Sequence, residues 1–173
     1  LFKSATKPVK EYVIDDSIEG WADSAGVLLS SYFENPVYPE YFGYNVKFVY
    51  DNIRPKGAYL SSGVGKAPGP EPLRIANEEV RRLLDTLVED GVDRLRPIHA
   101  YDIMMHLSDA VLSGGVRRSA SLALFSVDDN EMATAKTGDW RATNPQRARA
   151  NNSALLVRSE TSFEQLANLI SSV

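Results

Sequence analysis

Two adjacent glycines followed by two arginines, Gly114-Gly115-Val116-Arg117-Arg118, form the stretch of this chain best suited to binding an anion. Glycine adopts positive φ without steric cost, and a Gly-Gly pair lets a ligand or another backbone segment approach closely. Each guanidinium can hold a phosphate or a carboxylate through two parallel hydrogen bonds. Because an apolar helical pattern precedes the glycines and an alternating run follows the arginines, we expect a helix, a flexible basic turn and a strand in succession.

A second flexible segment, residues 60–70, is the longest run of turn-forming residues in the chain. Its Gly65-Lys66 pair suggests a phosphate-binding loop, but Leu60 stands where that motif requires glycine and Ala67 where it requires Ser or Thr. The motif is therefore absent. A Gly-Lys pair in a loop can still contact a phosphate, so ligand contact and an ordinary structureless crossover both remain open.

Four potential metal ligands share one face of a helix predicted over Pro97–Ser113: His99, Asp102, His106 and Asp109. The alternative is the polar face of an amphipathic helix, with Asp102 and His106 as an i, i+4 pair. The opposite face would carry the apolar residues of this helix, which are Ala100, Ile103, Met104, Leu107 and Val111. Neither histidine has a nucleophile beside it in the sequence, so neither indicates nucleophilic catalysis.

Polar side chains also gather before the last predicted strand. Arg141, Arg147 and Arg149 are either a solvated basic loop or part of an anion pocket shared with the two arginines of the basic turn. Asn151 and Asn152 offer several hydrogen-bond donors and acceptors, as expected of residues that contact a ligand, or they form a turn.

Composition narrows the class of protein. The 173 residues are 43% hydrophobic and 24% charged, which is typical of a single globular domain or one large piece of a bigger one. A net charge of −4 argues against a general nucleic-acid binder, and no apolar run is long enough for a membrane span. We therefore expect a cytoplasmic protein. The chain has no cysteine, which excludes disulfides, Cys-ligated zinc and thiol chemistry from its own residues.

Strand-like runs alternate with helical patterns, which predicts an α/β fold with few strands, such as part of a sheet or barrel. The four predicted strands are 11–14, 46–50, the run in which Ala120, Leu122 and Leu124 share a face, and 154–157. The helix with the apolar residues Val80, Leu84 and Leu87 should end at Gly91. Three capping-box spacings predict helix starts, at Asp16 with Glu19, Asp128 with Glu131, and Thr161 with Glu164.

Four motifs occur in a fixed order along the chain: Glu19-Gly20-Trp21-Ala22-Asp23-Ser24, Ile53-Arg54-Pro55-Lys56-Gly57 with the loop to Pro70, Gly114-Gly115-Val116-Arg117-Arg118-Ser119-Ala120, and Ala150-Asn151-Asn152-Ser153. This succession resembles the adenosylcobalamin-dependent (class II) ribonucleotide reductases, of the ribonucleoside-triphosphate reductase type. The resemblance runs from about Tyr12 to about Val157.

The resemblance implies that residues 1–173 form one segment of the family's ten-stranded α/β barrel, in its first half, together with helices of the effector region. The loops near 54–73 and 113–121 would contact the substrate and an allosteric dNTP. The implied substrate- and effector-binding residues are Lys56, Gly57, Gly63, Gly65, Gly69, Gly114, Gly115, Val116, Arg117, Arg118, Ser119, Ala120, Asn151 and Asn152.

In such an enzyme adenosylcobalamin generates a thiyl radical, and further cysteines supply the reducing electrons. The resemblance places those cysteines before Leu1 and after Val173, so this chain would hold no catalytic residue and would be inactive alone, as a piece of a split gene, an intein-interrupted gene or a truncated protein. The implied partners are a ribonucleotide substrate, a dNTP effector, the cysteine-bearing segments and a thioredoxin-like or dithiol reductant, with no nucleic acid and no membrane.

Two other functions remain open. The chain could be a non-catalytic nucleotide-binding regulatory module on the same scaffold. It could also be a metal-dependent hydrolase that uses His99 and His106.

Overall fold

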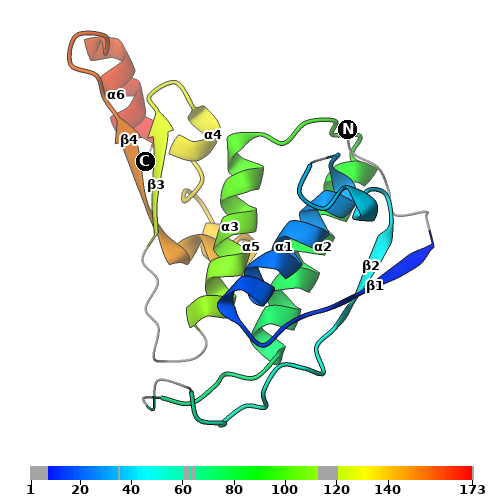
Figure 1. The fold of residues 1–173 in the computed structure, drawn as a ribbon. Coiled ribbons are helices and arrows are strands. Elements are labelled where there is room, and N and C mark those ends of the chain that lie inside the picture. The colour runs from blue at the N-terminus through cyan, green and yellow to red at the C-terminus, as the bar shows by residue number, and fades with distance from the viewer. Residues whose placement is uncertain (1–7, 35, 61–62, 64, 113–120, 173) are drawn as a thin grey trace. The chain divides into compact units, whose positions relative to one another are not determined.

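The first two strands, β1 (Val9–Val13) and β2 (Asn45–Val49), are parallel neighbours, and the chain passes from one to the other through helix α1 (Ile18–Tyr32) and a short 3-10 helix at Pro39–Tyr41 (Figure 1). They belong to a computed structural model that describes residues 8–34, 36–60, 63, 65–112 and 121–172. A strand, a helix and a parallel strand form a βαβ unit, in agreement with the predicted α/β class.

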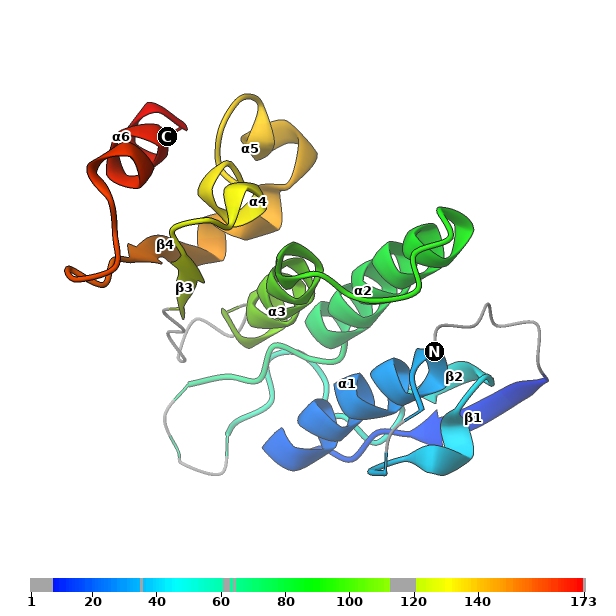
Figure 2. The same cartoon turned by 90° about the horizontal axis from the view of Figure 1, so that it is seen from above.

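Helix α2 (Glu71–Glu89) follows β2 and lies beside α1 in both views (Figure 1, Figure 2). The predicted apolar residues of α2 are buried, with Val80 and Leu84 almost fully covered. Gly91 ends the helix as predicted, since it adopts φ of +72° and donates its amide to the carbonyl of Val88.

Helix α3 (Pro97–Leu112) begins at the predicted proline, but its predicted buried face is only partly right, since Ile103 is buried while Ala100 and Val111 are exposed. His99, Tyr101 and Asp102 are buried, whereas Met104 is 57% exposed. The polar residues are covered because Asp102 has a charged partner elsewhere in the chain, which a pattern within one helix cannot reveal.

The second parallel strand pair is β3 (Ser121–Ser126) and β4 (Ala150–Leu155). Between them come two short helices, α4 (Asn130–Ala133) and α5 (Trp140–Thr143), and a 3-10 helix at Pro145–Arg149. Helix α6 (Phe163–Ser172) follows β4.

Two of the strand predictions need correction. The strand predicted at 154–157 begins four residues earlier, so Asn151 and Asn152 lie inside β4 and not in a turn before it. In β3, Leu122 and Leu124 share a face as predicted, but that face is exposed, and Phe125 on the other face packs into the core.

All three predicted helix starts are wrong by one residue. The observed caps are Ser17, Asp129 and Ser162, whose side-chain oxygens accept the backbone amides of Gly20, Met132 and Gln165. Each predicted cap directly precedes another residue that can cap, so the spacing of a capping box alone does not choose between the two.

The chain divides into two units, which are described separately below. Unit 1 consists of Leu1–Leu95 and His106–Arg118, and unit 2 consists of Arg96–Met105 and Ser119–Val173. Within the part of the chain that the structure describes, no helix is long and apolar enough to cross a membrane.

Candidate functional site

A cavity of about 760 Å³ in unit 1 adjoins the start of α1 and the loop between β2 and α2. Apolar side chains such as Trp21, Leu60 and Leu107 form much of its wall. Polar groups on the wall come from three places, namely Asp16, Ser17 and Glu19 at the start of α1, Arg54, and Lys66.

The N-terminus of α1 is fixed by two contacts. Ser17 accepts the amide of Gly20 at 2.9 Å, and Gly20 itself lies so close to the preceding turn that a Cβ there would be 2.5 Å from the carbonyl oxygen of Asp15. Only glycine fits at this position. The first amides of a helix have no partner within the helix, so this end of α1 carries a partial positive charge beside the cavity.

Arg54 and Asp16 form an ion pair on the cavity wall. The guanidinium Nε donates to Asp16 Oδ2 at 2.5 Å, and both side chains are about one-third exposed. Lys66 is exposed and has no carboxylate within ion-pair distance among the described residues. The cavity therefore offers one cation that is already paired and one that is free to meet an anion.

The loop after β2, for which ligand contact and a structureless crossover both remained open, contains the backbone hydrogen bonds of an irregular hairpin. Gly57 donates its amide to the carbonyl of Ala67 at 2.9 Å, and Ala67 donates to Ala58 at 2.8 Å. Tyr59 and Lys66 form an antiparallel bridge. These bonds connect the two sides of the loop and place Lys66 at the cavity.

Glycines allow the turns of this loop, since four of the predicted site residues have positive φ: Gly57, Gly63, Gly65 and Gly69. At Gly69 a second constraint applies, because a Cβ would lie 2.9 Å from the backbone nitrogen of Lys56. The two predicted residues Lys56 and Gly69 are therefore in contact through their backbones, while the side chain of Lys56 is exposed.

The motif at residues 19–24 connects the cavity to the rest of unit 1. Trp21 packs against the apolar cluster of Ile14, Ile53 and Leu73. Asp23 accepts the hydroxyl of Tyr38 at 2.7 Å, and this hydrogen bond raises the pKa of Tyr38 to about 12. The motif thus holds α1 in place, and its Trp21 side chain reaches the cavity.

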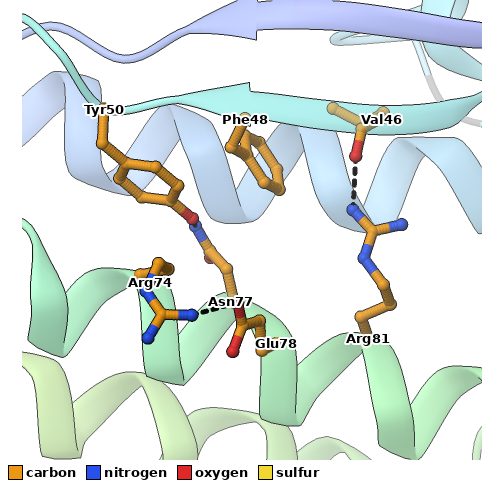
Figure 3. A pocket seen from close by; sticks show the side chains of 7 residues that line it. All are labelled: Val46, Phe48, Tyr50, Arg74, Asn77, Glu78 and Arg81. Atoms are coloured by element: carbon orange, nitrogen blue, oxygen red, sulfur yellow. Dashed lines mark hydrogen bonds and ion pairs between the residues drawn. The ribbon is translucent and has the colours of Figure 1, made fainter.

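A second hollow in unit 1, of about 280 Å³, lies between β2 and α2 (Figure 3). Phe48 and Tyr50 point toward α2, and Arg81 donates to the carbonyl of Val46 at 2.6 Å. Arg74 is paired with both Glu71 and Glu78. Arg74 is thus neutralised by two carboxylates, whereas Arg81 donates to the neutral oxygens of Asn45 and Val46.

In unit 2, Asn151 and Asn152 point to opposite faces of β4 because successive side chains alternate along a strand. Asn151 is exposed. Asn152 turns inward and accepts a hydrogen bond from the hydroxyl of Tyr101 at 2.8 Å. Its amide nitrogen is buried and has no hydrogen-bond partner among the described residues.

Arg147 is neither a solvated residue nor part of an anion pocket. Its guanidinium donates to both oxygens of Asp102, at 2.7 and 2.6 Å, and to the carbonyl of Ala135 at 2.7 Å. Gln146 adds a further hydrogen bond to Asp102 at 3.1 Å. The charged partner of Asp102 is thus Arg147, a residue far along the chain.

Two of the four residues in the metal interpretation of α3 have other partners. Asp102 is bound to Arg147, and His99 Nδ1 accepts the backbone amide of Arg96 at 3.2 Å. No group of three or more His, Asp or Glu side chains that could hold a metal ion is found among the described residues.

The structure thus brings Lys56 and Gly69 together in unit 1 and places Asn151 and Asn152 in β4 of unit 2. The predicted basic turn, Gly114–Ala120, lies outside the described residues. The pair of Asp16 with Arg54, and Tyr101, were not predicted as site residues. Each of these contacts joins residues tens of positions apart, so no local pattern indicates them.

A search of solved structures finds the same fold in a B-12-dependent (class II) ribonucleotide reductase. The match has a TM-score of 0.74 and 27% sequence identity, and it covers 94% of this chain and 21% of that chain. The fold of this chain is therefore that of a segment of a class II ribonucleotide reductase, and the predicted fold class is confirmed.

Sequence relatives agree with this result. Adenosylcobalamin-dependent ribonucleoside-triphosphate reductases are 33% identical over 147 residues in Lacticaseibacillus paracasei and 30% identical over 159 residues in Euglena gracilis, covering 83% and 88% of this chain. A probable member from Dictyostelium discoideum is 32% identical over 140 residues, or 79% of this chain. No family model matches the chain.

The homologues of this chain are thus adenosylcobalamin-dependent ribonucleoside-triphosphate reductases, and the resemblance inferred from its four motifs is confirmed. The matches cover only 16 to 20% of the length of these relatives. The chain corresponds to one part of such an enzyme.

Proposed function

We propose that this chain is the nucleotide-binding part of an adenosylcobalamin-dependent ribonucleoside-triphosphate reductase, an enzyme that converts ribonucleotides to 2′-deoxyribonucleotides. The observation that carries the proposal is the identity of about 30% with such reductases over most of the chain, beside the four ordered motifs of its sequence. As one segment of the reductase barrel, it contributes the loops near 54–73 and 113–121.

The effector nucleotide, a dNTP, occupies the cavity of unit 1. Its phosphates meet the N-terminus of α1, Arg54 and Lys66, since a helix N-terminus and basic side chains together favour an anion. The apolar wall, including Trp21 and Leu60, receives the base. The backbone of Gly57, Gly63, Gly65 and Gly69 shapes the loop, and Lys56 lies beside it.

The substrate ribonucleotide is read by the turn Gly114–Ala120 and by the exposed Asn151. In this proposal the guanidiniums of Arg117 and Arg118 transmit occupancy of the effector cavity to the substrate base. In this assignment Asn152 supports Asn151 from the buried face of β4.

Adenosylcobalamin, when bound to the complete enzyme, supplies the radical that starts reduction. The residues of this chain do not fit the thiol chemistry that follows, because the chain has no cysteine to carry a thiyl radical or donate reducing electrons. Cysteine-bearing segments of the reductase and a thioredoxin-like or dithiol reductant provide these groups. The chain binds and orients nucleotides, acts in the cytoplasm, and needs neither nucleic acid nor a membrane.

Calorimetric titration of the full chain with each of the four dNTPs tests the effector site. We expect binding, and we expect Lys66→Ala to weaken it by about tenfold or more, since a charge-assisted hydrogen bond is lost. Lys47→Ala is the matched control, because Lys47 is an exposed lysine paired with Glu11 outside the cavity. Absence of dNTP binding, or equal loss in both variants, would contradict the assignment.

An activity assay distinguishes the reductase proposal from the alternative of a regulatory module that binds nucleotides without taking part in catalysis. Adding the cysteine-bearing segments should restore ribonucleotide reduction in the presence of adenosylcobalamin. Nucleotide binding with no restored activity would favour the regulatory module.

A further inference from the structure

We propose that Tyr101 is a positioning residue for substrate recognition, which holds Asn152 so that the neighbouring Asn151 faces the nucleotide. This inference rests on the proposed function, in which Asn151 contacts the ribonucleotide. It concerns residues of unit 2 only.

Tyr101 is placed to hold β4 from the side of α3. It is 7% exposed, and its hydroxyl lies 2.8 Å from Asn152 Oδ1 and 3.2 Å from the carbonyl oxygen of Arg147. A phenol has a single proton, so the hydroxyl donates to one of these oxygens at a time. Both oxygens belong to the segment that leads into and forms β4.

No other side chain competes for Asn152. The amide nitrogen of Asn152 is buried without a partner among the described residues, so Tyr101 is the polar contact that orients this side chain. If the amide is turned by 180°, its nitrogen donates to the phenol, the phenol donates to the carbonyl of Arg147, and Tyr101 remains the anchor.

The adjacent residue of α3 fixes the same segment. Asp102 binds the guanidinium of Arg147 through both carboxylate oxygens, five residues before Asn152. Asp102 therefore contacts Arg147, in the 3-10 helix before β4, while the adjacent Tyr101 contacts Asn152 in β4 itself.

The register of the sheet connects this contact to β3. In β3, the strand that directly follows the basic turn, Leu122 pairs with Asn151 and Ala123 pairs with Asn152. Helix α3 directly precedes the same turn. The hydrogen bond from Tyr101 to Asn152 thus joins α3 to β4, and with Asn152 held on the buried face, strand alternation leaves Asn151 on the exposed face.

The variant Tyr101→Phe removes the hydroxyl and leaves the ring in the core. In calorimetric titrations of the full chain with the four ribonucleoside triphosphates, we expect affinity to fall by about three- to tenfold, the effect of one hydrogen bond. Affinity for dNTPs at the cavity of unit 1 should stay unchanged. The matched control is Tyr41→Phe, a buried tyrosine whose hydroxyl makes no hydrogen bond among the described residues.

Two further measurements distinguish positioning from a general loss of stability. In an Asn152→Ala background, Tyr101→Phe should have no additional effect on ribonucleotide affinity, because the hydroxyl acts through Asn152. Additive effects, or equal losses for ribonucleotides and dNTPs, would overturn the proposal.

NMR of the Asn152 side-chain amide decides the proposal even if the chain binds no ribonucleotide, an outcome that contradicts the proposed function of this site. Tyr101→Phe should shift this signal and broaden it through rotamer exchange. An unchanged signal would show that Tyr101 does not hold Asn152.

Discussion

Asp102 on α3 and Arg147, 45 residues later, form a two-point ion pair inside unit 2. The Nε and Nη2 of the guanidinium donate to the two carboxylate oxygens at 2.7 and 2.6 Å. The side chain of Arg147 is 13% exposed and that of Asp102 is 8% exposed. Gln146 and the carbonyl of Ala135 take up further hydrogen bonds of the pair. Burial of both charges is possible because each is neutralised and hydrogen-bonded by the other.

Removing the carboxylate charge should strongly destabilise unit 2. Asp102→Asn leaves the guanidinium of Arg147 buried without a counter-charge, and loss of one partner of a buried pair costs about 3 to 5 kcal/mol. Urea unfolding followed by circular dichroism measures the loss. The control is Glu71→Gln, which breaks an exposed pair with Arg74 on α2 and should have a small effect. Comparable losses in the two variants would argue against this role for the pair.

The ion pair also shows why α3 was only partly predictable. The start of the helix was predicted correctly, because Pro97 at a first helical position is a local signal. The pattern of apolar residues did not predict the full buried face, because the burial of Asp102 depends on Arg147, a residue far along the chain. The same limit explains why Arg147 was expected to be solvated or to bind an anion.

The helix starts and β4 show a different limit. Ser17 and Ser162 cap their helices directly after the predicted Asp16 and Thr161, since neighbouring residues of similar chemistry compete for one cap. In β4 the polar residues Asn151 and Asn152 resemble a turn in sequence, but pairing with β3 makes them part of a strand. Secondary structure and the family were predictable, whereas the exact caps depend on competition between neighbouring residues and the extent of β4 depends on its pairing with β3.

Close packing at Gly69 should make that position intolerant of any side chain. Gly69→Ala meets two penalties, a positive φ of +79° and a Cβ at 2.9 Å from the nitrogen of Lys56. Gly57→Ala is the matched control, since it shares the positive φ but has open space around its Cβ position. We expect a loss of about 1 to 2 kcal/mol from the backbone in both variants, and a greater loss at Gly69. Equal unfolding free energies of the two variants would show that the contact with Lys56 is not tight.

Stability should fall in mild acid because of His99. Burial disfavours the charged imidazole, and the guanidinium of Arg96 repels a proton, so the pKa of His99 is lowered, with Glu131 and Asp102 opposing the shift. The folded state then binds fewer protons than the unfolded state once the pH drops below the ordinary histidine pKa of about 6.5. Above that pH the ring is neutral in both states and contributes no pH dependence.

The variant His99→Gln isolates this contribution. Urea midpoints of the wild type should decrease as the pH falls below about 6.5, and those of the variant should decrease less, since the proton-binding ring is gone. The remaining slope comes from the other titrating groups. Parallel curves for the two proteins over this range would show that His99 titrates alike in the folded and unfolded states.

The two arginines of the basic turn should control how an effector changes substrate choice. In the complete reductase, Arg117→Ala with Arg118→Ala removes the guanidiniums that we propose transmit dNTP binding to the substrate base. The ratio of kcat/KM values for two ribonucleotides, measured with and without each dNTP, should lose an effector dependence of about fivefold or more, the usual lower range of allosteric coupling. The control is Arg94→Ala with Arg158→Ala, which removes the same charge from exposed positions outside the motifs. If the effector response is unchanged by loss of Arg117 and Arg118, these arginines do not transmit effector binding. That outcome would not contradict nucleotide binding in the cavity of unit 1.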